Sequence, residues 1–337
     1  MADTNLRVMQ SFGAPRSTTN PYIHMLDAAL RATPGLQHLR FDRRQALFGR
    51  YDVLHLHWPE SLMGGSTPLR ALARRMFFAA LLVRVRLSRI AIVRTAHNVG
   101  LPDVGRWERR MLQKVEDRTS LRIVLNEFTP VDGEAALIPH GHYKDWFTAT
   151  RHEAEPGSLA FVGLVRRYKG VETLLDAFET TRERAPQLRL SVAGNPTSAQ
   201  IRDDITARAA LDDRIRLDLR YLSEDDFAEA ILGAEGVVLP YRFMHNSGSV
   251  LAALSLDRRV LVPRNEVNES LSAEVGTGWV TMFDGELDGD DLIAFHESLR
   301  TAPAAPPRLD ARDWSAAGAR HLQAFQRAFE IRRGRNA

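Results

Sequence analysis

Short apolar runs alternate with longer amphipathic stretches along the first half of the chain. Runs rich in Val, Ile and Leu predict strands, and apolar residues that recur at helical spacing predict helices. Residues 6–11, 53–57, 90–95, 121–125 and 135–139 are the predicted strands, and residues 21–31, 68–87 and 107–114 are the predicted helices. This alternation predicts a parallel sheet covered by helices.

The same alternation restarts after a polar stretch at residues 148–158, which contains Pro156 and Gly157 and is typical of a linker. The later predicted strands are 159–162, 188–193, 215–219, 236–240 and 260–262, and the helices are 171–184, 198–209, 223–232, a short one from residue 249, and 314–331. Two such blocks of similar size predict an α/β protein with two Rossmann-like domains, 1–148 and 149–312.

Composition supports two domains and narrows the classes of function. The 337 residues exceed what one hydrophobic core usually organises. A net charge of +3, from 45 basic and 42 acidic side chains, is too balanced to indicate a nucleic-acid partner. The lack of cysteine excludes disulfides and thiol nucleophiles. Because no apolar run approaches the roughly 20 residues of a membrane-spanning helix, and no apolar signal segment is found, we expect a cytoplasmic protein.

The loop FVGLVRRYKG, residues 161–170, leads from a predicted strand into a predicted helix. Open α/β sheets bind ligands at the carboxyl ends of their strands, so this loop lies where a ligand is expected. Arg166 and Lys169 are cations near a helix N-terminus, which suits a diphosphate. The alternative is that both are ordinary solvated charges.

A second loop of this kind, VVLPYRFMHNSGSVL, spans residues 237–251. Backbone N–H groups at a helix start can bind phosphate or sugar oxygens. The candidate donor-binding residues here are Tyr241, His245, Asn246, Ser247, Gly248 and Ser249. Simple helix capping by Asn246 or Ser247 is compatible with binding. After another strand, Asn195 is either a contact for the nucleoside or part of a plain turn.

Strand ends of the first domain carry histidines and a carboxylate. His55 and His57 alternate along one strand and so share a face, but no further ligand cluster accompanies them and we predict no metal site. Glu60 is a candidate general base or a surface carboxylate. His97 is a candidate base, a contact for the donor sugar, or a structural histidine.

The last predicted strand of the first domain ends within the sequence IPHGHY, residues 138–143. We expect three of these residues to line a cleft between the domains: His140, Gly141 and His142. A glycine at this place allows a close backbone approach.

Six segments, in order, carry a family resemblance: TTNPYIHMLDAAL, YDVLHLHWPE, TAHN, IPHGHYKDWF, VGLVRRYKGVETLLDAF and LPYRFMHNSGSVLAALSL. They resemble the GT-B glycosyltransferases and, within them, the bacterial GDP-mannose:glycolipid 4-β-D-mannosyltransferases of exopolysaccharide synthesis. The resemblance spans residues 20–314. It implies two Rossmann-like domains that face each other across a cleft, with a C-terminal helix, 313–332, that packs back on the N-terminal acceptor domain. It also implies GDP-mannose as donor and a polyprenol-linked oligosaccharide as acceptor.

The chain departs from the retaining GT-B enzymes at one informative point. Those enzymes carry two glutamates eight positions apart, and the matching positions here are Met244 and Ala252. The resemblance therefore implies an inverting enzyme, which needs a base for the acceptor hydroxyl and positive charge for the leaving diphosphate. We assign the base to Glu60 first and His97 second. No bound metal is expected.

The predicted helix at residues 68–87 combines five arginines with Phe77, Phe78, Leu81 and Leu82. A basic helix with exposed aromatic residues can lie on an anionic membrane surface. The alternative is a domain helix with a buried apolar face and solvated arginines. Because the implied acceptor is a lipid, we favour contact with the inner face of the cell membrane.

Three alternatives remain open from the sequence. Another nucleotide-sugar donor, such as UDP-glucose or UDP-glucuronic acid, fits the same loops. A non-catalytic GT-B shell that binds a nucleotide sugar is suggested by the missing glutamates, whereas an enzyme is favoured by His97, Arg166, Lys169 and residues 246–248. A nucleic-acid-binding role is disfavoured by the balanced charge.

Overall fold

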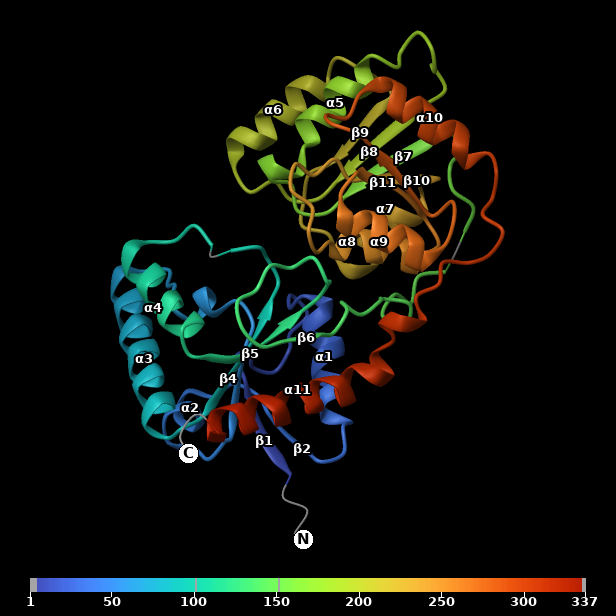
Figure 1. Cartoon of the computed structure of the whole chain (residues 1–337). Helices are drawn as coiled ribbons and strands as arrows, with labels where there is room; N and C mark the ends of the chain where they lie inside the picture. Colours follow the sequence, from blue (N-terminus) through green and yellow to red (C-terminus); the bar gives the residue numbers. More distant parts are fainter. Residues whose placement is uncertain (1–4, 101, 151, 335–337) are drawn as a thin grey trace. The chain divides into compact units, whose positions relative to one another are not determined.

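The computed structural model describes residues 5–100, 102–150 and 152–334 (Figure 1). The chain divides into two compact units. One unit holds the residues up to Gly141 together with those from Arg312 onward, and the other is His142–Ala311. Each unit is built on a six-stranded parallel sheet with flanking helices, so the predicted α/β class is confirmed. The division after Gly141 lies upstream of the predicted boundary at residue 148.

The sheet of the first unit has the strand order β2-β1-β3-β4-β5-β6. Its strands are β1 (Leu6–Gln10), β2 (Leu36–Leu39), β3 (Val53–Leu56), β4 (Ala91–Ala96), β5 (Thr119–Val124) and β6 (Ala135–Leu137). Its helices are α1 (Pro21–Arg31), α2 (Arg43–Phe48), α3 (Pro68–Leu87), α4 (Arg106–Glu116) and α11 (Trp314–Gly334). The order reverses between β1 and β3, and such a switch point is where open α/β sheets bind ligands.

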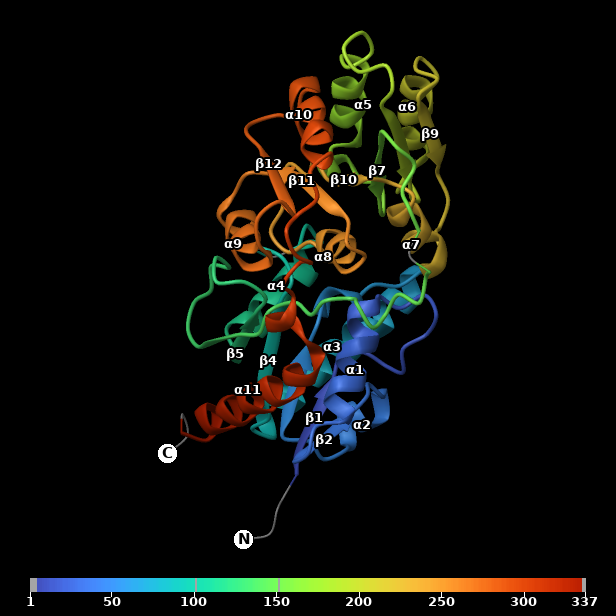
Figure 2. The same cartoon turned by 90° about the vertical axis from the view of Figure 1, so that its right-hand side faces the viewer.

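Helices cover both faces of this sheet. Neighbouring residues of β4 point to opposite sides, as strand geometry requires: Val93 packs with Leu26 of α1 and Phe325 of α11, and Ile92 packs with Leu81 of α3. The last helix of the chain therefore completes the core of the first unit, lying against α1 (Figure 2).

The sheet of the second unit has the order β12-β11-β10-β7-β8-β9. Its strands are β7 (Ser158–Val162), β8 (Arg189–Ala193), β9 (Ile215–Asp218), β10 (Gly236–Val238), β11 (Arg259–Pro263) and β12 (Val280–Phe283). Its helices are α5 (Val171–Glu179), α6 (Ala199–Ala209), α7 (Glu224–Leu232), α8 (Gly248–Ser255), α9 (Glu266–Val275) and α10 (Gly289–Leu299). The switch point lies between β7 and β10, so the two loops singled out in the sequence meet there.

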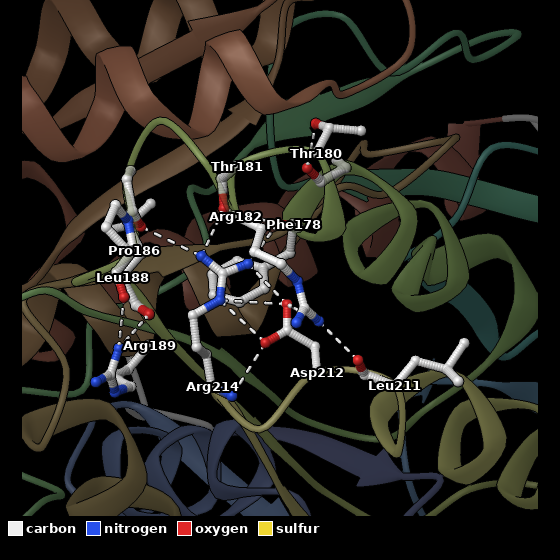
Figure 3. A network of polar contacts seen from close by, with 12 residues as sticks. Phe178, Thr180, Thr181, Arg182, Pro186, Leu188, Arg189, Leu211, Asp212 and Arg214 are labelled. Carbon is white, nitrogen blue, oxygen red and sulfur yellow. Dashed lines mark hydrogen bonds and ion pairs between the residues drawn. The ribbon is translucent and has the colours of Figure 1, made fainter.

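Helix α5 ends at Glu179, which corrects the predicted end at residue 184. The hydroxyls of Thr180 and Thr181 donate to carbonyls of the last turn, at 2.8 and 2.7 Å. The guanidinium of Arg214 donates to the carbonyl of Phe178 at 3.1 Å and lies over its ring (Figure 3). Beyond Glu179 the chain continues in tighter turns, in which the backbone N–H groups of Thr181 and Arg182 donate to the carbonyls of Phe178 and Glu179, each at 3.1 Å, so the regular α-helix ends there.

Candidate functional site

The loops after β1, β3 and β4 meet at the switch point of the first sheet. Ser11 ties two of them together, because its Oγ accepts from the backbone N–H of His57 at 2.7 Å and donates to the His57 carbonyl at 3.2 Å. His97, one residue beyond β4, lies with Nε2 at 2.9 Å from Nδ1 of His57. The Trp58 ring stacks on His97 with centroids 3.9 Å apart. Trp58 holds a left-handed backbone (φ +45°), a strained conformation for a bulky residue that its packing keeps in place.

Histidines gather in the core of the first unit beneath this loop cluster. His55 lies between Gln10 Oε1 and Thr95 Oγ1, each at 2.8 Å. Burial lowers the pKa of His57 to about 3, lowers the pKa of His321 to about 4, and holds the pKa of His97 well below its usual value. These rings are therefore neutral at physiological pH.

Glu60 lies on the 3₁₀ helix Pro59–Leu62, directly after Trp58, and is half-buried. Burial lowers the pKa of Arg94, and the negative charge of Glu60 opposes this effect in part. Arg94 also pairs with Glu116, whose other partner is Arg122 at 3.0 Å. Glu60 therefore acts electrostatically on a row of alternating charges, Arg94, Glu116 and Arg122, which help to line a polar cavity of about 530 Å³.

Two aromatic residues that the sequence did not single out, Tyr22 and Trp314, pack beside the histidines of the first unit. The Tyr22 ring meets His97 edge-on at 5.3 Å and lies 4.7 Å from the ring of His140. Trp314, the first residue of α11, packs 5.5 Å from the Tyr22 ring. A Cβ on Gly141 would lie 2.2 Å from the Trp314 ring, so this glycine permits the close approach predicted for it, although the partner is an indole. Only the position of Trp314 at a helix start was visible in the sequence.

In the second unit, the loops after β7 and β10 converge. The ammonium of Lys169 lies 4.7 Å from the centre of the Tyr241 ring, and the Tyr241 hydroxyl donates to Ser249 Oγ at 3.4 Å. A Cβ on Gly163 (φ +137°) would contact both Lys169 Nζ and Ser249 Oγ at 3.4 Å. The glycine therefore leaves a small recess lined by a cation, a hydroxyl and the first turn of α8, which is suited to phosphate oxygens.

Helix α8 starts beside this recess, and a serine at its own N-terminus caps it. Ser247 Oγ accepts from the backbone N–H of Val250 at 3.4 Å, so Ser247, rather than Asn246, is the N-cap of α8. A Cβ on Gly248 would lie 3.2 Å from the hydroxyl of Tyr143, a buried ring that packs against this turn. The remaining N–H groups of the first turn have no intrahelical partner and can bind an anion.

The other predicted residues have less distinctive surroundings. Arg166 and Asn195 are exposed, and the Asn195 carbonyl accepts from the backbone N–H of Val165 at 3.0 Å. His245 and Asn246 are half-buried, and burial lowers the pKa of His245. His142 is buried in the second unit, where its Nδ1 accepts from the backbone N–H of Lys144 at 3.3 Å.

The two positions that carry glutamates in retaining GT-B enzymes are buried. Met244 and Ala252 are 7% and 3% exposed. The Met244 sulfur accepts from Asn268 Nδ2 at 3.4 Å, and its carbonyl accepts from Asn265 Nδ2 at 3.0 Å. An unpaired carboxylate at either place would be costly, so the surroundings fit the apolar residues present.

Helix α3 corrects one expectation about the arginine-rich segment. Phe78, Leu81 and Leu82 are buried in the core of the first unit and Phe77 packs against it, so the aromatic residues are not exposed. A different apolar row is exposed: Leu69, Leu72, Met76, Val83 and Leu87. Within the described residues, no helix is long and apolar enough to cross a membrane.

A metal site is not indicated in the part of the chain that the structure describes. There, no group of three or more His, Asp or Glu side chains is arranged to hold an ion. The two histidines that alternate along β3 form hydrogen bonds instead: the His55 ring with Gln10 and Thr95, and the His57 ring with His97.

Comparison with known proteins gives a consistent result. No protein-family model matches the sequence. Two curated sequences from Xanthomonas campestris pv. campestris, both named GDP-mannose:glycolipid 4-beta-D-mannosyltransferase, are 40% identical to the chain over 331 residues, covering 97% of this chain and 94% of each relative. Among solved structures, Anabaena Alr3699/HepE in complex with UDP-glucose has a TM-score of 0.59 at 10% identity, covering 98% of this chain and 99% of that one. The glycosyltransferase AviGT4 of avilamycin A biosynthesis has a TM-score of 0.57 at 15% identity, with 96% and 98% coverage. The fold is GT-B.

Proposed function

Because the chain belongs to the family of the GDP-mannose:glycolipid 4-beta-D-mannosyltransferases, we propose that it transfers mannose from GDP-mannose to a lipid-linked oligosaccharide in exopolysaccharide synthesis. The chain is a glycosyltransferase by this membership. The structural observation that carries the proposal is the recess at the β7–β10 switch point. There Lys169, Ser249 and the first turn of α8 offer positive charge and hydrogen-bond donors to a diphosphate.

The proposed reaction inverts the configuration at the sugar. The carboxylate of Glu60 takes the proton of the acceptor hydroxyl, the hydroxyl oxygen forms a bond to the anomeric carbon, and the bond from that carbon to the diphosphate oxygen breaks. Lys169 and Arg166 stabilise the negative charge that develops on the departing GDP. The buried Met244 and Ala252 support this mechanism, since neither of them supplies a carboxylate.

The assignment of the base is tested by Glu60→Gln, which keeps the shape of the side chain. A general base contributes about 10²–10⁴-fold to the rate, so turnover should fall by that factor while GDP binding is unchanged. Glu127→Gln, at another strand-end loop of the first unit, is the matched control. A Glu60→Gln enzyme with most of its turnover would remove Glu60 from this role.

Isothermal calorimetry tests the donor. We expect GDP-mannose and GDP to bind, and UDP-glucose and UDP-glucuronic acid to bind far more weakly. Selective binding of a UDP-sugar would overturn the donor assignment but keep the site, whereas no binding of any nucleotide would favour a non-catalytic shell.

We also propose that the reaction needs no bound metal, because cationic side chains take the place of the ion at the diphosphate. Turnover of GDP-mannose in excess EDTA should equal turnover without it. Loss of activity in EDTA that Mg²⁺ restores would contradict this part of the proposal.

Contact with a membrane surface is supported by the exposed face of α3. Leu69, Leu72, Met76, Val83 and Leu87 recur at helical spacing and are each more than half exposed. Arg70 and Arg86 are exposed on the same helix. An apolar row flanked by arginines fits an amphipathic helix lying in the interface of an anionic bilayer.

Flotation with vesicles tests this contact. Wild-type protein should float with vesicles that contain phosphatidylglycerol and remain behind with pure phosphatidylcholine. Met76→Glu/Val83→Glu should abolish flotation without changing GDP-mannose binding, and Leu211→Glu, an exposed leucine of the second unit, is the control. Equal flotation of the Met76→Glu/Val83→Glu variant and the wild type would refute the assignment.

A further inference from the structure

The hydrogen bond between His57 and His97 decides what His97 can do chemically. The two rings are joined through Nδ1 of His57 and Nε2 of His97, 2.9 Å apart. Between two neutral imidazoles one nitrogen donates and the other accepts, so the direction of this bond fixes the tautomer of both rings. His57 Nε2 is buried and has no hydrogen-bond partner among the residues that the structure describes.

Two neighbouring histidines of the first unit have a backbone carbonyl beside Nδ1. Nδ1 of His321 lies 2.7 Å from the carbonyl of Ala317, and Nδ1 of His140 lies 2.8 Å from the carbonyl of Gly141. A carbonyl can only accept, so both rings carry their proton on Nδ1. His321 Nε2 is then a lone pair that is buried and, within the described part of the chain, accepts no hydrogen bond. The core of the first unit therefore already contains one imidazole, that of His321, whose Nε2 is a buried lone pair.

The two possible directions of the hydrogen bond between His57 and His97 place different groups at the buried Nε2 of His57. If His97 donated, His57 would carry its proton on Nε2, leaving an N–H group buried without an acceptor. If His57 donates from Nδ1, its Nε2 is a lone pair, as at His321. Buried N–H groups without a partner are rare in proteins, and under-used acceptors are less so. The second direction is therefore favoured.

We infer that His57 is a positioning residue that donates Nδ1–H to Nε2 of His97 and thereby fixes His97 as a hydrogen-bond donor through its own Nδ1–H. A neutral His97 ring has one lone pair, and His57 occupies it. His97 then cannot accept the proton of the acceptor hydroxyl, and it serves the proposed reaction by donating a hydrogen bond to a substrate oxygen. This role rests on the proposed function, and it leaves Glu60 as the base.

Nitrogen NMR of the full-length protein with ¹⁵N-labelled histidine tests the tautomer without any substrate. Protonated and unprotonated imidazole nitrogens have well-separated chemical shifts, and the His97 signals are identified by their loss in His97→Asn. We expect His97 to be protonated at Nδ1 in the wild type and in His57→Asn, whose amide NH₂ can replace the Nδ1–H donor. His57→Asp offers only an acceptor and should move the His97 proton to Nε2. A wild-type His97 protonated at Nε2 would overturn the inference.

Turnover of GDP-mannose supplies the second readout. His97→Asn keeps a donor near the position of Nδ1 and should lose about tenfold in kcat, whereas loss of a general base costs about 10²–10⁴-fold. His57→Asp should lose more than His57→Asn, with little change in the KM for the donor. A His97→Asn loss as large as that of Glu60→Gln would overturn the donor role. If the NMR result holds but no mannose is transferred, the proposed function fails and the tautomer assignment stands.

Discussion

Replacing Arg214 with leucine should strongly destabilise the second unit. Arg214 and Asp212 form an ion pair with side chains only 7% and 2% exposed, and Arg214 donates to Asp212 Oδ2 at 2.7 Å (Figure 3). It also donates to Thr181 Oγ1 and to the carbonyls of Ala185 and Phe178, at 3.1–3.2 Å. Removing one partner of a buried pair costs about 3–5 kcal/mol, because the remaining charge, here Asp212, loses its main buried counterion.

Arg182→Gln is the matched control for this prediction. Arg182 also approaches Asp212, at 3.5 Å, but it is half exposed, so its loss should cost less than about 1 kcal/mol. Urea unfolding followed by hydrogen exchange of the 178–218 segment measures the free energy of unfolding locally. Equal effects of Arg214→Leu and Arg182→Gln would refute the reasoning.

The pH dependence of the Arg214→Leu effect gives a second check. The hydrogen bond from Arg214 lowers the pKa of Asp212 below its ordinary value, despite the opposing effect of burial. A carboxyl group with a lowered folded-state pKa stabilises the protein above its unfolded-state pKa of about 4, and this stabilisation is lost as the pH falls through the folded-state value. The difference between wild type and Arg214→Leu should therefore shrink below about pH 4. A difference that stays constant down to pH 2 would show that the ion pair is not its source.

Three further predictions concern the site. Lys169→Met should lower kcat by about 10²-fold or more, since it removes the cation at the proposed diphosphate recess, and it should leave the unfolding transition unchanged. Gly170→Ala should weaken GDP binding in calorimetry and lower the free energy of unfolding by about 1–3 kcal/mol, because Gly170 has φ +67° and a Cβ there would lie 2.2 Å from the carbonyl oxygen of Pro240. The control is Gly285→Ala, which has φ +73° and open space around it and therefore measures the cost of the backbone conformation alone. Burial lowers the pKa of His321 to about 4, so protonation of this ring should cost the first unit up to about 1.4 kcal/mol of stability per pH unit as the pH falls from 6.5 to 4. His321→Phe should remove this contribution from the pH dependence of urea unfolding.

Long, strongly periodic elements were predictable from local pattern. Helices α1 and α3 begin and end where the sequence predicts, because a threonine or asparagine cap and a proline at the first turn mark their starts. Strands β2 and β12 and helices α2, α9 and α10 were not predicted. The two strands lie at sheet edges and are only partly buried, so they lack the continuous apolar run that marks a central strand.

The loops of the donor recess were predictable for a different reason. Strand order in a doubly wound sheet places the first and fourth strands of the block next to each other, so FVGLVRRYKG and VVLPYRFMHNSGSVL had to meet once the two-domain pattern was recognised. The contact between Lys169 and the Tyr241 ring follows from that topology. What periodicity could not show is that Gly163 opens the recess, because that depends on the distances between side chains of β7, its loop and α8.

The packing of the buried histidines in the first unit could not be predicted, because these histidines come from distant parts of the chain. His55 and His57 were visible as an alternating pair on a strand, but the chemistry of His57 is set by His97, forty residues later, and the tautomer pattern of the core is read from His321 on α11. That helix reaches the first sheet only after the chain has built the whole second unit. A histidine at a strand end is ambiguous between base, donor and structural residue until the partner of each ring nitrogen is known. The role of His97 is therefore a property of the assembled core, and the sequence alone could name it only as a candidate.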